Sequence, residues 1–152
     1  MVDEFDRRIL NIMESDCDRA LKDIGKDIGL YSPSAVSKRI KDLKAAGIIK
    51  KNVSLIDYEK LGYKFMTIIF IKTKYSKNYA TSVGEKLKKL PNIISIYFVL
   101  GDIDFILLNI NKSIEEYRLV MEALTTMEEI ERSDSRVVAY KIKDIDFDTI
   151  DL

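Results

Sequence analysis

The order of the predicted strands and helices after residue 63 is the feature that most restricts the fold of this chain. Strands are indicated by β-branched and aromatic runs, and helices by apolar residues at helical spacing. The predicted elements are a strand at 64–75, a helix at 79–90, strands at 93–100 and 103–111, a helix at 113–126 and a strand at 136–143. The order β-α-β-β-α-β is that of the ferredoxin-like fold, an antiparallel sheet with both helices on one face. We therefore expect an α+β fold with a ferredoxin-like domain over residues 64–152.

The second predicted strand, 93–100, is apolar on both of its faces. Ile96 and Phe98 alternate along it with Tyr97 and Val99. A strand that is apolar on both faces needs cover on both. The two helices cover one face, and a chain of this length leaves little to cover the other. We therefore expect a homodimer that forms through the C-terminal sheets.

Three helices are predicted before this domain, at 2–15, at 21–28 and from Ser32 to Gly47. Ser32 suits the N-cap of the third helix and Pro33 its first position, while Gly29 ends the second helix. The residues that follow Gly47 alternate between apolar and polar, which predicts a short two-stranded wing. The pattern indicates a winged helix-turn-helix domain at 1–56, joined to the sheet domain by a polar hinge at 57–63.

Positive charge is concentrated on the third helix and the segment after it. The full chain carries 25 basic and 25 acidic side chains, but residues 31–51 carry six basic ones and a single acidic one. A small basic helix of this kind enters the major groove of DNA. The alternative is a solvated basic face without a partner. We expect double-stranded DNA to contact Ser32, Ser34, Ser37, Lys38, Arg39, Lys41, Lys44, Lys50 and Lys51, with Ser34, Ser37 and Lys38 nearest the base edges.

The residue types that are absent restrict the chemistry of the chain. It has no histidine and a single cysteine, Cys17, which excludes histidine-ligated metal sites, Ser-His and Cys-His nucleophile pairs and internal disulfides. We therefore expect no catalytic residues, no metal and no cofactor. The acidic N-terminus does not resemble a signal peptide, and charges interrupt the apolar stretches before they reach the length of a membrane span. We expect a soluble, cytoplasmic protein that does not bind membranes.

An ordered set of segments gives the chain a family resemblance. The segments are D-E-F-D-R-R-I-L-N at 3–11, S-P-S-A-V-S-K-R-I-K-D-L at 32–43, G-I-I at 47–49, D-Y-E-K-L-G-Y at 57–63, P-N-I at 91–93 and G-D-I-D-F at 101–105. Together they resemble the Lrp/AsnC family, also called feast/famine regulatory proteins. The resemblance spans essentially all 152 residues.

The resemblance implies a transcriptional regulator whose C-terminal effector domain, the RAM domain, forms dimers that often assemble into octamers. It also implies that a free amino acid binds between dimers, near the Gly-Asp turn and the polar segment before the last strand. The residues that match this site are Phe98, Gly101, Asp102, Ile103, Asp104, Ser133, Ser135 and Arg136. Carboxylates and exposed amides of this kind suit an α-ammonium and an α-carboxylate. The alternative is that Asp102 and Asp104 are ordinary turn residues.

Several positions depart from the family pattern. Tyr31 lengthens the turn before the third helix by one residue, Tyr58 replaces a frequent hinge proline, and serines stand at 133 and 135 where threonines are common. Glu128-Glu129 stands where a Pro-Gly is usual. The nearby carboxylates of Glu131 and Asp134 suggest that the effector is a basic amino acid, such as lysine or arginine. The alternative is that both carboxylates are simply solvated.

Two other functions remain open from the sequence. One is an architectural DNA-binding protein that has no effector. The other is an enzyme similar to the sirohaem decarboxylases, which resemble this family in fold. The absence of histidine and the acidic neighbours of Cys17, which raise rather than lower a thiol pKa, argue against the enzyme.

Overall fold

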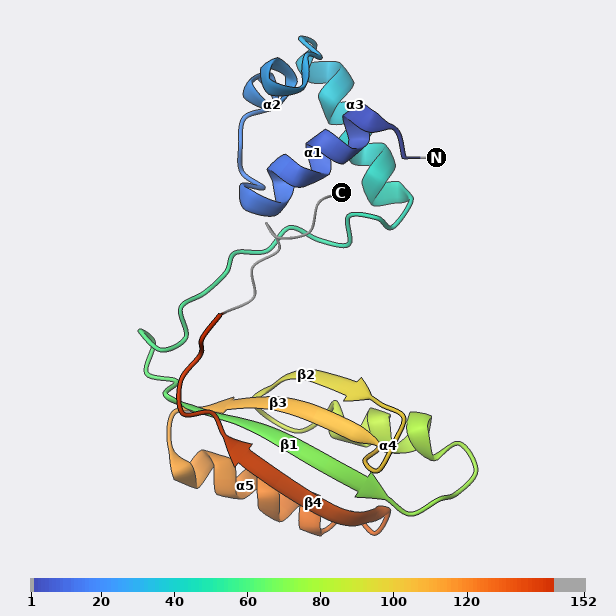
Figure 1. The fold of residues 1–152 in the computed structure, drawn as a ribbon, viewed down its shortest axis with the longest axis vertical. Helices are drawn as coiled ribbons and strands as arrows, with labels where there is room; N and C mark the ends of the chain where they lie inside the picture. The colour runs from blue at the N-terminus through green and yellow to red at the C-terminus, as the bar shows by residue number, and fades with distance from the viewer. Residues whose placement is uncertain (1, 144–152) are drawn as a thin grey trace. The chain divides into compact units, whose positions relative to one another are not determined.

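The computed structural model describes residues 2–143, and these residues form two compact units (Figure 1). One unit is built from the chain up to Leu55 and the other from Ile56 to Lys141. Each unit has its own hydrophobic core.

The first unit consists of three helices, α1 (Glu4–Ser15), α2 (Leu21–Ile28) and α3 (Pro33–Ala45). A reciprocal capping box begins α1: the Asp6 amide donates to the Asp3 carboxylate at 2.9 Å, and the Asp3 amide donates to the Asp6 carboxylate at 3.1 Å. The predicted start of α3 is confirmed, with Ser32 as its N-cap and Pro33 at its first position. The core of this unit consists of Ile9, Ile24, Ile28, Val36, Ile40 and Leu43.

The turn between α2 and α3 packs closely against α2 at Gly25. A Cβ atom built on Gly25 would lie 2.4 Å from the carbonyl oxygen of Leu30 and 3.3 Å from Cγ2 of Val36. Gly29 ends α2 in the left-handed conformation, with φ of 78°. Glycine at position 25 therefore allows the turn, and α3 after it, to approach the second helix.

The predicted two-stranded wing is wrong, because residues 48–56 contain no strand. Ile49 packs against the core of the first unit, but Val53 and Leu55 are exposed. A lone two-stranded ribbon is marginally stable unless an apolar face packs against the rest of the protein. Alternating residues alone were therefore a weak basis for predicting strands here.

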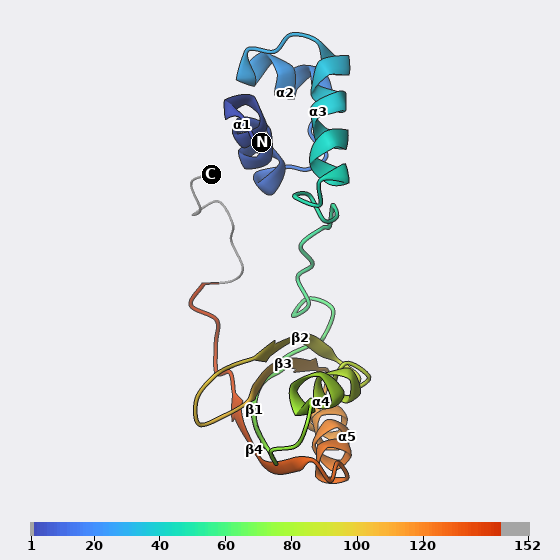
Figure 2. The same cartoon turned by 90° about the vertical axis from the view of Figure 1, so that its right-hand side faces the viewer.

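The second unit is a four-stranded antiparallel sheet with two helices, as the ferredoxin-like order predicts. Its elements are β1 (Phe65–Thr73), α4 (Tyr79–Leu87), β2 (Ile93–Phe98), β3 (Phe105–Asn111), α5 (Ile114–Thr125) and β4 (Ile130–Val137), and the strand order is β2-β3-β1-β4. Both helices lie on the same face of the sheet (Figure 2). Between the sheet and the helices lies the core, made of Ile69, Ile71, Val83, Leu87, Phe105, Leu107, Val120 and Leu124.

The position of the last strand differs from the prediction of 136–143. The observed strand β4 begins at Ile130 and pairs with β1 in a register that places Ser133 opposite Ile71 and Ser135 opposite Ile69. Its sequence, I-E-R-S-D-S-R-V, lacks the apolar alternation of a half-buried strand. At the edge of the sheet, backbone hydrogen bonds to β1 and the packing of Ile130 against the core hold this polar segment in place.

The sheet has a second face, opposite the helices, which we call the open face. The strand registers place apolar side chains of β1, β2 and β3 there, together with three charged ones from β4. The apolar residues include Ile68 and Phe70 of β1, Ile106 and Leu108 of β3, and Tyr97 of β2; the charged residues of β4 are Arg132, Asp134 and Arg136. Tyr97 is 59% exposed. The open face is thus apolar on β1, β2 and β3 and charged along β4.

Candidate functional site

The first candidate site is the outer face of α3. Ser34, Lys38, Lys41 and Lys44 are exposed there, and Ser37 is half-buried at the edge of the same face. Residues three and four apart share one side of a helix, so these side chains form one basic surface. Lysine and serine are suited to contacts with DNA phosphates and base edges.

Ser32 has a structural role at the start of this helix. Its hydroxyl accepts a hydrogen bond from the Ala35 amide at 3.4 Å and lies 2.8 Å from the Ser34 hydroxyl. The preceding Tyr31 projects into solvent, with 82% of its surface exposed. The cap therefore places Ser34 at the exposed N-terminal end of α3.

Arg39, which the sequence predicts as a phosphate contact, is engaged in ion pairs inside the first unit. Its Nη1 atom lies 2.8 Å from a carboxylate oxygen of Asp3 and 2.8 Å from one of Asp6, and its guanidinium lies over the ring of Phe5. Hydrogen bonds to Asp6 and Asp3 raise the pKa of Arg39. Arg39 thus holds α3 against the beginning of α1.

Lys50 and Lys51 follow α3 on the segment that lacks strands, and both are exposed. They carry positive charge beyond the end of the helix. Because this segment contains no strands, Lys50 and Lys51 lie on an irregular backbone and not on a β-hairpin.

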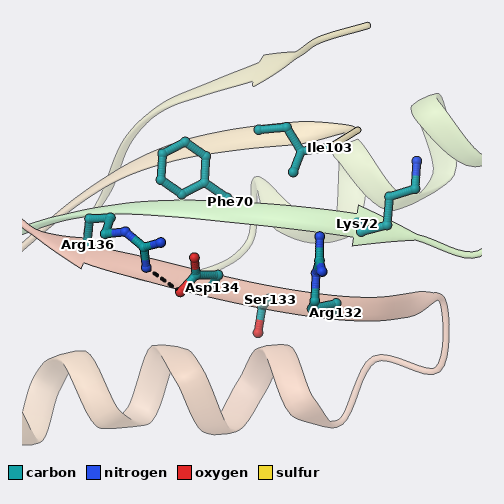
Figure 3. A pocket seen from close by; sticks show the side chains of 7 residues that line it. All are labelled: Phe70, Lys72, Ile103, Arg132, Ser133, Asp134 and Arg136. Carbon is teal, nitrogen blue, oxygen red and sulfur yellow. Dashed lines mark hydrogen bonds and ion pairs between the residues drawn. The ribbon is translucent and has the colours of Figure 1, made fainter. Parts of the chain in front are cut away.

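The second candidate site is a hollow on the open face of the sheet, which we call the β1–β4 hollow (Figure 3). Its volume is about 660 Å³. It is lined by Phe70, Lys72, Ile103, Arg132, Ser133, Asp134 and Arg136. The hollow therefore combines apolar side chains with three cationic ones.

The charges around the hollow are unevenly paired. Lys72 and Arg132 stand directly opposite each other in the β1–β4 register. The Arg136 guanidinium is 2.6 Å from a carboxylate oxygen of Asp134, as the dashed line in Figure 3 marks. The Arg132 side chain makes no ion pair or hydrogen bond with any other residue between 2 and 143.

Asp104 lies beneath the hollow and is a buried anchor, with 3% of its surface exposed. Its carboxylate accepts hydrogen bonds from the amide of Thr73 at 2.8 Å and from the Thr73 hydroxyl at 2.9 Å. It also lies 3.4 Å from the ammonium of Lys72. Burial raises the pKa of Asp104, but the hydrogen bonds from Thr73 and the charge of Lys72 together outweigh this effect and lower it. Asp104 therefore orients Lys72 rather than facing a ligand.

The structure separates the other residues of the predicted effector site. Ile103, Ser133 and Arg136 line the hollow, although the Ser133 side chain points toward α5 (Figure 3). The Ser135 hydroxyl is hydrogen-bonded to Tyr117 of α5, on the helix side of the sheet.

Phe98, Gly101 and Asp102 also lie outside the hollow. Phe98 packs edge-on against Tyr79 and Phe105. Gly101 and Asp102 are exposed in the loop between β2 and β3, where Gly101 has φ of 141°. None of these side chains is among those that line the hollow.

Asp134, expected near the effector, lines the hollow, whereas sequence reasoning did not assign Phe70, Lys72 and Arg132 to the site. Lys72 was detectable, because it interrupts the otherwise apolar run of β1 (F-M-T-I-I-F-I-K-T). The β4 residues were not assigned to the open face because the strand was expected six residues later.

Among residues 2–143, no group of three or more His, Cys, Asp or Glu side chains is arranged to hold a metal ion. No helix in that same range is long and apolar enough to span a membrane.

Comparisons with known proteins agree with both units. Residues 2–44 match the AsnC-type helix-turn-helix domain, and residues 66–146 match the Lrp/AsnC ligand binding domain. The HTH-type transcriptional regulator FL11 of Pyrococcus horikoshii is 31% identical over 137 residues, which cover 90% of this chain and 89% of that protein. The transcriptional regulator AzlB of Bacillus subtilis is 32% identical over 140 residues, or 91% of this chain and 88% of AzlB.

A solved structure shows the same fold. It is a transcriptional regulator from Neisseria meningitidis in complex with L-methionine, with a TM-score of 0.86 and 21% identity, covering 95% of this chain and 94% of that one. At that identity the likeness concerns the fold. The matched domains and the curated relatives identify the family: this chain belongs to the Lrp/AsnC family of transcriptional regulators.

Proposed function

We propose that this protein binds DNA through the exposed face of α3 and that a small amino acid modulates this binding. The observation that carries the proposal is the basic surface of α3, which is presented by a capped helix in a helix-turn-helix unit. Because its partner is DNA, we place the protein in the cytoplasm.

In this proposal the exposed cations of the first unit neutralise phosphates, and the small polar residues of α3 approach base edges. The phosphate contacts are Lys38, Lys41, Lys44, Lys50 and Lys51; the residues nearest the bases are Ser34, Ser37 and Lys38. Ser32 and Arg39 act on DNA binding indirectly. Ser32 caps the helix, and Arg39 fixes it against α1.

The test is the salt dependence of binding to the protein's own promoter. Each phosphate contact contributes about −0.9 to the slope of log affinity against log salt concentration. The double substitution Lys38→Ala/Lys41→Ala should therefore make the slope shallower by about 1.8. Lys88→Ala/Lys89→Ala, the same change of charge in the second unit, is the control and should leave the slope unchanged. Equal slopes for the two variants would refute the placement.

We further propose that the apolar part of the open face is covered by a second copy of this chain. Ile68, Ile106, Leu108 and Tyr97 give this surface an apolar character that monomeric proteins seldom expose over a large area. Burying a glutamate in such an interface is unfavourable. Leu108→Glu should therefore lower the mass measured by sedimentation by breaking the dimers, whereas Val53→Glu in the first unit should not. An unchanged mass for Leu108→Glu would refute this interface.

We propose that these dimers assemble further into octamers, as the family resemblance implies. Ile114 and Leu119 on α5 support this step, because they are 60% and 59% exposed although they are large and apolar. Leu119→Glu should stop assembly at the dimer. A variant that sediments like the wild-type octamer would exclude α5 from the contact.

The effector in this proposal is a free amino acid. Two findings support it: the match of residues 66–146 to a ligand-binding domain, and the L-methionine complex of the Neisseria regulator. Calorimetry with a panel of amino acids tests it directly. Heat with at least one amino acid supports effector binding, and no heat with any would instead favour an architectural protein without an effector.

A further inference from the structure

We propose that the β1–β4 hollow is an anion site that selects an acidic amino acid, such as glutamate or aspartate, over a basic one. This inference rests on the proposed effector function and names the chemical class of the ligand. It reverses the hypothesis of a basic effector that Glu131 and Asp134 suggested.

The first argument is the direct cross-strand pairing of Lys72 with Arg132. Like charges directly opposite in a sheet repel each other. Lys72 is held in place by the buried Asp104, at 3.4 Å, and by a hydrogen bond to the Tyr75 hydroxyl at 3.2 Å. Two cations fixed on adjacent strands are stabilised by a shared anion between them.

The second argument is that the local carboxylates are already engaged. Asp104 is occupied by Thr73 and Lys72, and Asp134 is paired with Arg136 at 2.6 Å. These pairs leave the Arg132 guanidinium without a partner in the described part of the chain. Arginine binds carboxylates with two parallel hydrogen bonds, so Arg132 can receive a ligand carboxylate.

The third argument concerns the residues that suggested the opposite charge preference. Glu131 lies at the register shift between Lys72 and Thr73, where the regular alternation of side chains is interrupted, and it is not among the residues that line the hollow. Among the described lining residues, Lys72, Arg132 and Arg136 outnumber the single carboxylate of Asp134. A ligand with net negative charge is favoured there, and one with net positive charge is disfavoured.

The lining also suits the rest of an amino acid. Phe70 and Ile103 provide apolar contact for its carbon chain, and the Asp134 carboxylate oxygen that does not pair with Arg136 can accept from its ammonium. The charged β4 edge is separate in chemistry from the apolar part of the open face. A second copy that covers Tyr97, Ile106 and Leu108 is therefore compatible with a ligand beside Arg132.

The experiment is calorimetry of the full chain at pH 7 with glutamate, aspartate, lysine, arginine, methionine, glutarate and inorganic phosphate. We expect glutamate or aspartate to bind at least tenfold more tightly than lysine or arginine. Glutarate, which lacks the ammonium, should bind more weakly than glutamate, and phosphate should not displace glutamate at equal concentration. If phosphate competed with glutamate equally well, the hollow would bind anions in general, and the proposed selection of an acidic amino acid would be overturned.

Variants at one position sharpen the test. Arg132→Gln should weaken glutamate binding at least tenfold, and Arg132→Glu should reverse the preference toward lysine. Arg118→Gln on α5 removes an exposed arginine outside the hollow and should change neither affinity. Unchanged glutamate binding by Arg132→Gln would overturn the proposal.

A gel shift on the same samples separates this inference from the proposed function. Tighter binding of lysine or methionine than of glutamate, with DNA binding intact, overturns the acidic preference alone. A wild-type protein that neither binds its promoter nor any amino acid overturns both.

Discussion

Replacing Gly25 with alanine should destabilise the helix-turn-helix unit, although alanine is the better helix former. The control substitution is Gly84→Ala in α4, which should make the second unit more stable. Both glycines lie inside helices, and neither has a positive φ. The gain from helix propensity, about 1 kcal/mol, is therefore common to the two substitutions.

The difference between the two sites comes from what the added methyl group meets. At Gly84 the nearest atom is Cε1 of Phe105 at 3.7 Å, an ordinary contact, so about 0.5–1 kcal/mol of the propensity gain should remain. At Gly25 the methyl would lie 2.4 Å from the Leu30 carbonyl oxygen, a backbone atom that must move. Overpacking of this kind costs about 1–3 kcal/mol.

Movement of Leu30 also disturbs a hydrogen bond. The Leu30 amide donates to the Gly25 carbonyl at 2.7 Å, and such a bond contributes about 1 kcal/mol. Adding the cost of this hydrogen bond to the overpacking and subtracting the propensity gain leaves a net loss of about 1–3 kcal/mol for Gly25→Ala. Loss of DNA affinity should follow, because Val36 of α3 lies against the same position.

The assay is urea unfolding followed by amide hydrogen exchange, with the peptides of each unit monitored separately. Gly25→Ala should lower the midpoint for residues 2–55 alone, and Gly84→Ala should raise it for residues 56–141 alone. A Gly25→Ala protein as stable as wild type would show that the turn relaxes freely and that the close approach at Gly25 is not a constraint.

Three further perturbations test individual contacts. Arg39→Gln should lower the unfolding midpoint of the first unit and leave the salt slope of DNA binding unchanged; a shallower slope would restore Arg39 as a phosphate contact. Asp104→Asn should flatten the acid side of the stability profile of the second unit, measured by urea unfolding between pH 2 and pH 7. The lowered pKa of Asp104 means that its contribution is present above the ordinary carboxyl pKa of about 3.9 and is lost as the pH falls through the folded value. Ser135→Ala removes a partner of Tyr117 and should lower the thermal midpoint of the second unit without weakening glutamate binding, since Ser135 faces the helices. A steep acid transition in Asp104→Asn, or weaker glutamate binding by Ser135→Ala, would contradict these assignments.

Most of the fold could be predicted from local patterns. Capping residues such as Asp3, Ser32 and Ser113 begin helices where expected, and the spacing of Val36 and Ile40 identified the buried side of α3. These features depend on neighbours in sequence, which a single chain displays directly. The order of the sheet elements then restricted the topology of the second unit.

The parts that failed depend on contacts between distant residues. The ion pairs of Arg39 could not be predicted, because its partners lie 36 and 33 positions earlier, at Asp3 and Asp6. The alternation after Gly47 indicated a hairpin, yet residues 48–56 contain no strand and Val53 and Leu55 are exposed. In each case the tertiary partner, absent from the local pattern, determined the outcome.

The position of strand β4 was also predicted wrongly, and the reason bears on the function of the second unit. A strand chosen for stability alone would place apolar residues on both faces here, because β1 beside it is apolar on the open face at Ile68 and Phe70. Residues 132–136 instead alternate cations and a carboxylate toward the open face with serines toward the helices. The polar sequence of β4 made this strand difficult to predict, and the same polar residues give the hollow its charge. Positions where local sequence preference and the fold disagree are often functional, and at Arg132 the disagreement leaves a cation without a partner in the described chain, as an anion-binding site requires.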